Sequence, residues 1–334
     1  MRFKKRLATA TIIACVFFLG FSLNAFAGKQ KYEEKFNETI ALVKSGKVVL
    51  TNISGDIDVK TWNRSEVEID AKKISKASSM EKAKEHADKV TIEIEKKGDV
   101  LYIKTEYPKI SSNVFNVSVD FNLMIPEGAS ASMKSVSGDI FMKKIGGKAN
   151  ANSVSGDIVM ESITGSLVAN AVSGDIEVLR AGSGVECESV SGELTLEDIT
   201  GNAYLKAVSG DITVAGLKGS VEADSVSGDI KVMGVSDAST VTVKVLSGDV
   251  DYAGDIYADG RYTFKSHSGD VILVLPADAA FDLEAKTFSG TIDSAFEIMV
   301  MGKLSKREIR GSVNNGGAAV TVGTFSGDVH LKKK

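Results

Sequence analysis

Acidic side chains recur through this 334-residue chain at a spacing that could hold cations. The phrase Ser-Gly-Asp returns every 18 residues, for example at Ser155-Gly156-Asp157 and Ser173-Gly174-Asp175. If equivalent residues stack, neighbouring carboxylates lie about 5 Å apart and repel by about 1 kcal/mol in water. Bound calcium would relieve that repulsion. The acidic row comprises Asp139, Asp157, Asp175, Glu193, Asp211, Asp229, Asp249 and Asp270.

Two features of the phrase favour a structural corner over a calcium site. Glycine takes a positive φ without strain, and serine and aspartate bond nearby backbone amides. Calcium-binding nonapeptide rolls carry glycines and an aspartate in both halves of each coil, whereas the second half here reads Ile163-Thr164-Gly165. We therefore predict a corner and no metal or cofactor site, with calcium as the alternative.

Side chains suited to catalysis are few. The histidines His86, His267 and His330 form no zinc-like spacing with cysteine, and no phosphate-cradling glycine loop occurs. His267 replaces the valine found at Val208, which indicates a stacked ladder residue rather than a base. Trp62 follows an early copy of the phrase and is expected to pack in the core or cap. We predict no catalytic residue.

One irregular stretch keeps an enzymatic alternative open. Residues Gly254–Lys265 break the repeat and contain Asp255, Asp259 and Arg261. Large parallel β-helices host lyases and hydrolases that use clustered carboxylates and a basic residue. A polysaccharide-active enzyme is therefore the alternative function.

The first 27 residues have the pattern of a signal peptide. A basic head precedes an apolar stretch, and Ala25-Phe26-Ala27 supplies a small-x-small cleavage site. We predict an exported protein in the periplasm, on the cell surface or outside the cell. Lipidation at Cys15 is the less favoured alternative, because the apolar stretch continues past that residue.

Charge and cysteine usage limit the partners. Removing the four basic residues of the head lowers the net charge from −4 to −8, which argues against nucleic acid and against an anionic membrane. We predict no membrane insertion after signal cleavage. Only Cys187 then remains, so an internal disulfide is excluded.

The 18-residue period predicts an all-β parallel β-solenoid, similar to a β-helix or β-roll. After each phrase apolar residues alternate with variable ones, and a second glycine tends to fall nine residues later. Each coil therefore has two strands and two turns, in preference to three hexapeptides. Cys187 falls in register with Ala169 and Leu205, as a small inward residue. The column after the acid runs Ile140, Ile158, Ile176, Leu194, Ile212, Ile230, Val250, Val271, Ile292, Val329.

The ends of the chain depart from the period. Residues 28–130 are predicted to form an irregular β-rich N-terminal cap with one helix, Ser78–Asp88, and a hairpin at Lys97-Gly98. Residues 131–294 form the regular repeats and 295–334 a C-terminal coil and cap. Ala277–Lys286 and Ala295–Gly317 are expected as longer loops or a second cap. The predicted cap strands are Lys47–Val59, Glu66–Asp70, Val90–Glu95, Val100–Glu106 and Val114–Met124.

These segments resemble a known bacterial family. The tandem Ser-Gly-Asp-Ile phrases, "LTNISGDIDVKTW", "FNLMIPEGASASMKSVSGDI" and "LVLPADAAFDLEAKTFSGTI" are similar to an uncharacterised β-strand-repeat family that carries an adhesin label. That family is related to the toastrack domains of envelope-stress proteins. The resemblance covers nearly all of residues 40–331 and implies the fold, but no site residues.

The expected function is non-enzymatic. We predict an adhesin-like protein or envelope scaffold whose long, mildly acidic surface contacts an unknown protein or envelope polymer. A regulatory partner of an envelope-stress sensor is a further alternative.

Overall fold

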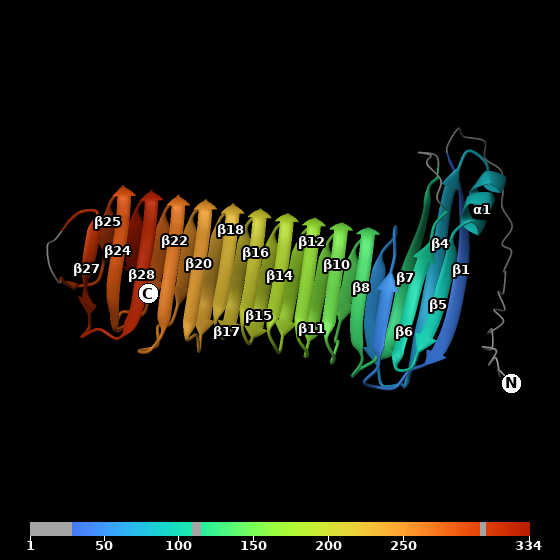
Figure 1. Cartoon of the computed structure of the whole chain (residues 1–334), viewed down its shortest axis with the longest axis horizontal. Helices are drawn as coiled ribbons and strands as arrows, with labels where there is room; N and C mark the ends of the chain where they lie inside the picture. The colour runs from blue at the N-terminus through green and yellow to red at the C-terminus, as the bar shows by residue number, and fades with distance from the viewer. Residues whose placement is uncertain (1–28, 109–114, 301–304) are drawn as a thin grey trace, which may run out of the picture.

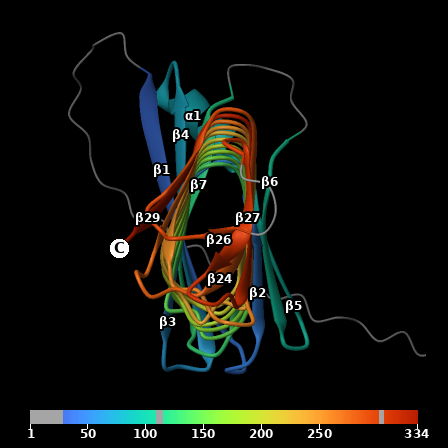
Figure 2. The ribbon, with the colours of Figure 1, turned by 90° about the vertical axis from the view of Figure 1, so that its left-hand side faces the viewer.

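The computed structural model describes residues 29–108, 115–300 and 305–334. Two long sheets, of 14 and 15 strands, face each other and form a rod (Figure 1). Viewed along the rod, successive rungs superpose as a flattened ring (Figure 2). We call the 14-stranded sheet, which contains β3, sheet A, and the 15-stranded sheet, which contains β2, sheet B. The predicted parallel solenoid is confirmed.

Each regular rung gives one strand to each sheet. β10 (Ala149–Ser155) crosses sheet B, the phrase turns the corner, and β11 (Ile158–Ile163) returns along sheet A. Ile158 pairs with Ile140 on one side and with Ile176 on the other. The nine-plus-nine division is therefore correct. The other regular strands are β8 (Ser130–Ser137), β9 (Ile140–Lys143), β12 (Leu167–Ser173), β13 (Ile176–Ala181), β14 (Val185–Ser191), β15 (Leu194–Thr200), β16 (Ala203–Ser209), β17 (Ile212–Lys218), β18 (Val221–Ser227), β19 (Ile230–Ser236), β20 (Thr240–Ser247), β21 (Val250–Gly254), β22 (Arg261–Ser268) and β23 (Val271–Leu275).

The core is the narrow space between the sheets. Every second side chain of a rung points into it, and Ile158 and Met160 are fully buried. Burying each such side chain contributes on the order of 1.5–3 kcal/mol. One rung has no partner for these faces, so stability depends on stacking.

A left-handed position recurs on sheet A in six successive rungs. Ser162 has no pairing partner in its strand and takes a φ of 60°, a left-handed conformation that costs an ordinary residue about 1–2 kcal/mol. The equivalent positions six residues after each corner glycine are Lys144, Ser162, Arg180, Asp198, Gly216 and Gly234, all with positive φ.

The N-terminal part extends both sheets. Its elements are β1 (Gln30–Ala41), β2 (Lys47–Thr51), β3 (Ile57–Trp62), β4 (Glu66–Ala77), α1 (Met80–Asp88), β5 (Thr91–Lys97), β6 (Val100–Glu106) and β7 (Val117–Pro126). The helix ends at Asp88 as predicted but starts at Met80 instead of Ser78, because the Ser79 hydroxyl caps it by accepting the amide of Lys82 at 3.2 Å. The predicted hairpin is also present, with Gly98 at a φ of 60° between β5 and β6.

Three strand predictions for this part need correction. Lys47–Val59 is two strands, because the corner at Gly55 divides β2 from β3. The strand predicted at Glu66–Asp70 continues to Ala77, since β1 pairs with its full length and β7 pairs with it from Glu68 to Ser75. β1 itself was not predicted, because its alternation places half-buried residues among charged ones.

The rungs at both ends are out of sequence order. β2 and β3 pair with β6 and β7 on one side and with β8 and β9 on the other. The first rung of the chain is therefore enclosed by the second and third rungs.

The same exchange occurs at the C-terminus. Val329 pairs with both Val271 and Ile292, so the predicted column order Val271, Ile292, Val329 is wrong. β27 runs antiparallel to β24, and the chain then inserts its last rung between β22 and β24 (Figure 1). The elements are β24 (Phe281–Ser289), β25 (Ile292–Ser294), β26 (Met299–Val300), β27 (Glu308–Val313), β28 (Ala318–Ser326) and β29 (Val329–Lys333). The predicted loop at Ala277–Lys286 is thus mostly strand, from Phe281 onward.

Candidate functional site

The recurring aspartates bond the backbone of the neighbouring rung. The amide of Asp157 donates to Oδ1 of Asp139 at 2.9 Å, and the amide of Asp175 donates to Oδ1 of Asp157 at 2.9 Å. Each carboxylate therefore satisfies a corner amide one rung further on, which the sheet ladder does not reach. The acceptors, in spatial order, are Asp120, Asp56, Asp139, Asp157, Asp175, Asp211, Asp229, Asp249, Asp270 and Asp328.

The two exceptions in the acidic row follow from this role. Glu193 receives no amide from Asp211 among the described residues, because its longer side chain does not present the oxygen at the corner. Thr291 lies on the last rung of sheet A, so no further corner needs an acceptor. Its amide and hydroxyl both donate to Asp328, which holds the pKa of that carboxyl below its ordinary value.

Asp120 is a member of this ladder that the repeat did not indicate. It stands outside any Ser-Gly-Asp phrase, yet its Oδ1 accepts the amide of Asp56 at 3.3 Å. Partial burial raises the pKa of Asp120, against the lowering effect of that hydrogen bond.

Only glycine fits the corner. Gly210 has a φ of 143°, and a Cβ there would lie 2.2 Å from the carbonyl oxygen of Gly192 in the rung before. The corner phrase is thus a structural device. Its serine, glycine and aspartate serve a tight turn that packs directly on its neighbour.

The described residues contain no group of three or more His, Cys, Asp or Glu side chains placed to hold a metal ion. The chemistry of the carboxylate row agrees with this, since one oxygen of each aspartate already accepts a backbone amide. The calcium alternative therefore gains no support from the geometry.

The histidines and the cysteine lie far apart in the fold. His86 is on α1 and its ring lies 5.1 Å from that of Phe115, whereas His330 is at the opposite end, with Nδ1 3.6 Å from Asp293. Cys187 is fully buried in the predicted register with Ala169 and Leu205, and burial raises the pKa of its thiol.

Trp62 lies at the end of β3. Its Nε1 donates to the carbonyl of Glu66 at 2.8 Å, and the guanidinium of Arg64 lies over the ring. These contacts are those of a packed turn residue.

Hydrogen bonds from tyrosine hydroxyls fix the irregular stretch Gly254–Lys265. The hydroxyl of Tyr257 donates to Oδ1 of Asp237 at 3.0 Å, and the hydroxyl of Tyr262 donates to the carbonyl of Ala238 at 2.9 Å. Asp255 takes part through its carbonyl, which accepts from the Tyr252 hydroxyl. Among the described residues the side chains of Asp255, Asp259 and Arg261 make no hydrogen bond or ion pair with one another. The stretch is an ordered turn rather than a carboxylate cluster.

An exposed apolar column on sheet B was missed at the sequence level. The residue two places before each corner glycine points outward, and the large apolar ones are 40–65% exposed. The column begins at Ile53, before the corner at Gly55. The ten rungs that follow, which we call the apolar stripe, carry Val136, Val154, Val172, Val190, Val208, Val226, Leu246, His267, Phe325 and Phe288. His267 is thus a ladder residue, as predicted, and stacks on Phe325 at 4.9 Å. The missed signal is the alternation of inward and outward residues along the strand. Ser153 is buried, so its neighbour Val154 points outward.

A shallow groove runs beside the stripe across seven rungs, from β2 to β18. Its floor is the column of buried small residues that includes Ser153, Ala171 and Ser189, and its far wall is a polar column that includes Asn152 and Lys206. The groove follows the rod axis rather than the strands.

A family comparison explains the repeated architecture. The family described as Toastrack DUF4097 matches residues 35–198 and again residues 166–332. The chain belongs to this toastrack family. The two matches overlap within the regular rungs, so the single rod accommodates the family pattern twice.

Solved structures similar to this toastrack chain are distant. Among them are a "putative cell adhesion protein" from Clostridium sporogenes ATCC 15579, a "putative adhesin" from Bacteroides fragilis NCTC 9343, and a "putative lipid binding protein" from Parabacteroides distasonis ATCC 8503. Their identities are 14%, 14% and 10%, and their TM-scores 0.21, 0.37 and 0.39. The matches cover 90%, 89% and 89% of this chain and 100%, 97% and 97% of the others. Comparison with curated proteins gave no match.

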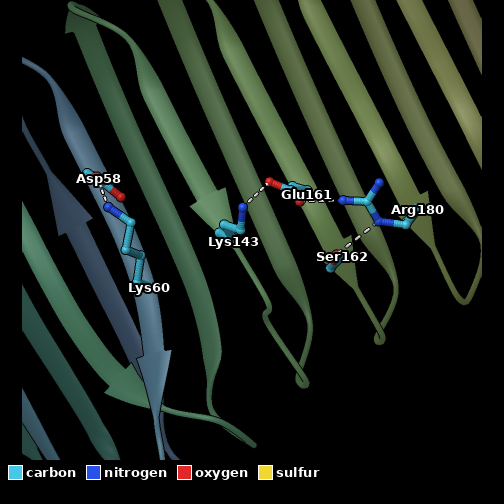
Figure 3. Close-up of polar contacts among 6 residues, drawn as sticks. All are labelled: Asp58, Lys60, Lys143, Glu161, Ser162 and Arg180. Atoms are coloured by element: carbon cyan, nitrogen blue, oxygen red, sulfur yellow. Dashed lines mark hydrogen bonds and ion pairs between the residues drawn. The ribbon is translucent and has the colours of Figure 1, made fainter.

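The outer face of sheet A in this toastrack rod carries ion pairs that cross rungs. Glu161 lies between Lys143, at 2.6 Å, and Arg180 (Figure 3). The hydrogen bond from Lys143 is the main cause that lowers the pKa of Glu161. Asp58 and Lys60 form a separate pair on β3 at 2.5 Å. Exposed pairs of this kind contribute about 0–1 kcal/mol each.

No helix within the described ranges has the length and apolar character needed to cross a membrane.

Proposed function

We propose that this toastrack chain is an exported, non-catalytic rod, adhesin-like or scaffolding, that contacts a protein or an envelope polymer. The observation that carries the proposal is the in-register stacking of equivalent outward side chains, exemplified by Val154, Val172 and Val190. A partner with its own repeat can make the same weak contact several times along such a surface. Repeated contacts of this kind raise overall affinity far above that of one contact.

The use of polar side chains supports a non-enzymatic role. The carboxylate row is engaged with corner amides, and the irregular stretch is fixed by Tyr257 and Tyr262. A hydrolase or lyase needs a carboxylate free to transfer a proton or attack beside its substrate. Asp237 and Asp259 line one hollow of the described surface, but Oδ1 of Asp237 already accepts the Tyr257 hydroxyl.

Export and domain organisation belong to the same proposal. We assign residues 1–27 as a cleaved signal, residues 28–130 as the N-terminal cap, 131–294 as the regular rod and 295–334 as the C-terminal coil and cap. The signal region and Cys15 lie outside the described residues. The acidic mature chain is suited to protein or polymer partners rather than to nucleic acid.

Removal of whole rungs tests this function. Deleting residues 156–173, or 156–191, joins Ser155 to a corner glycine and shortens the rod by one or two rungs. We expect both variants to keep the β-sheet circular dichroism spectrum of the parent chain. Co-sedimentation with isolated cell-envelope material should weaken stepwise as rungs are removed, because fewer contacts form.

Two results would contradict the proposal. One is a parent chain that stays in the soluble fraction with envelope material of every kind tried. The other is release of soluble sugar from cell-wall or plant glycans in a turnover screen, which would favour the enzymatic alternative. Fractionation of cells that produce the tagged chain tests export separately.

A further inference from the structure

The apolar stripe is asymmetric along the rod. Its five members from Val136 to Val208 are all valine, whereas four of the five from Val226 to Phe288 are other residues, three of them ring-bearing. At the bulky end the rings of Phe288 and Phe325 stack at 4.7 Å, with planes 4° apart. The ten-rung stripe therefore has a narrow half and a bulky half, which meet between β16 and β18.

The polar column two residues before the stripe is asymmetric about the same point. Lys206 and Asp224 lie on the two rungs at the midpoint, and Glu188 and Lys244 lie one rung further out. Along the rod the column reads Lys134, Asn152, Asn170, Glu188, Lys206, Asp224, Lys244, Lys265, Gly323 and Lys286. Opposite charges thus stand at equal distances on either side of the midpoint.

A two-fold axis through this midpoint matches both columns. An axis parallel to the strands turns the rod end for end and keeps each column opposite its own copy. Lys206 then faces Asp224 of the second copy, and Glu188 faces Lys244. Valines face bulky residues in the same operation, Val190 opposite Leu246 and Val172 opposite His267. The like-charged pair Lys134 and Lys286 falls at the two ends of the ten-rung stripe, at exposed positions where salt screens the repulsion.

We propose that two copies of this chain pack face to face through sheet B, antiparallel, with the apolar stripes in contact. Ten rungs at about 4.8 Å give an interface roughly 43 Å long, and seven-residue strands give about 23 Å of width. That face approaches 1,000 Å² per copy, above the roughly 800 Å² of a standard stable interface. An apolar stripe that stays exposed over ten rungs is unusual on a monomer.

The opposite orientation does not fit. An axis along the rod, under the stripe, would set every rung against its own copy, so Phe288 would approach Phe288 and valine would approach valine. Such an arrangement leaves the two ends of the interface unequal in width and does not bring Lys206 to Asp224. This pairing goes beyond the proposed function, because it holds whichever external partner the rod contacts.

Sedimentation velocity on the purified chain tests the pairing. We expect a mass of twice 35.3 kDa for the unprocessed chain, falling towards one chain only on dilution. In the dimer, position 206 of each copy faces Asp224 of the other copy. Lys206→Glu therefore places two acidic side chains against each other at both of these contacts and should raise the dissociation constant at least tenfold. The double variant Lys206→Glu with Asp224→Lys restores the pairs and should recover dimerisation. Lys231→Glu makes the same charge change on sheet A and should have no effect.

Cysteine crosslinking tests the orientation. Facing sheets lie about 10 Å apart, beyond the reach of a direct disulfide. Val190→Cys with Leu246→Cys should therefore yield covalent dimers with a short bifunctional thiol reagent, whereas Val190→Cys alone should not. Residues 190 and 246 lie three rungs apart within one chain, about 14 Å, which is too far for a short reagent to bridge internally. A single mass of 35.3 kDa at roughly 100 μM, a concentration that populates even weak dimers, would overturn the proposal. So would crosslinking of the single variant, or failure of the charge swap to rescue.

Discussion

The carboxylate ladder is interrupted at one interior rung, and shortening Glu193 by one methylene group should repair it. In the other interior rungs the corner amide donates to an aspartate at 2.7–3.0 Å, but the amide of Asp211 has only Glu193 beneath it. Glu193→Asp places a carboxylate oxygen where Asp157 and Asp175 already carry one. The backbone need not move, since the Glu193 amide itself donates to Asp175 in the standard way.

The size of the effect follows from the type of bond. A hydrogen bond to a charged acceptor contributes about 1.5–3 kcal/mol, and solvent exposure at the corner reduces that to about 1 kcal/mol. A gain of about 1 kcal/mol slows the local opening of the Asp211 amide about fivefold. For a chain of this length it raises the melting temperature by only about 1–2 °C.

Amide hydrogen exchange gives the sharper measurement. In the parent chain the Asp211 amide should exchange faster than the Asp229 amide, and Glu193→Asp should bring the two rates together. The matched control is Asp157→Glu, which should release the Asp175 amide by about the same factor. Equal protection of Asp211 and Asp229 in the parent chain would refute the reasoning, as would an unchanged rate in Glu193→Asp.

Three further predictions follow from the corner glycines, from the left-handed positions on sheet A and from the carboxylate ladder. Gly210→Ala should prevent folding to a soluble rod, whereas Gly184→Ala, whose Cβ would keep 3.6 Å from its nearest neighbour, should melt normally in circular dichroism. Gly216→Ala, at a φ of 74°, should lower the free energy of unfolding by about 1 kcal/mol in urea titration. Because the folded pKa of Asp328 is lowered, its stabilisation is present above the ordinary pKa of 3.8 and is lost as pH falls through the folded value. The difference in melting temperature between the parent chain and Asp328→Asn, which keeps an acceptor, should therefore vary with pH only in that acid range.

Period and alternation in the sequence were enough to predict the regular rungs. The stacking of Ile158 on Ile176 and the inward place of Cys187 both follow from the 18-residue step. The resemblance to the toastrack family was also correct. The corner was recognisable from residue types alone, since glycine with aspartate has few other uses at a fixed step.

Other features depend on information that a period does not carry. Period gives the position of a residue within a rung, but not the order of rungs in space, so the insertion of Val329 beside Val271 was missed. Whether Val154 points outward depends on which residue of the pair Ser153 and Val154 is buried. Serine is polar and valine is apolar, so the sequence favoured the wrong one of the two as the buried residue. The bond from Asp56 to Asp120 was invisible because Asp120 lies outside the phrase.

The exchanged order of the terminal rungs has a mechanical consequence. In a solenoid wound strictly in sequence, tension on either terminus peels away an outermost coil that has one neighbour. Here β2 with β3, and β28 with β29, are each hydrogen-bonded to neighbours on both sides. At the N-terminus the edge strand β1, which pairs only with β4 among the described strands, detaches first under tension. A pull on the C-terminus must instead shear two sets of parallel bonds before β28 and β29 leave the rod. The C-terminal end of the rod would therefore resist extension without a covalent crosslink.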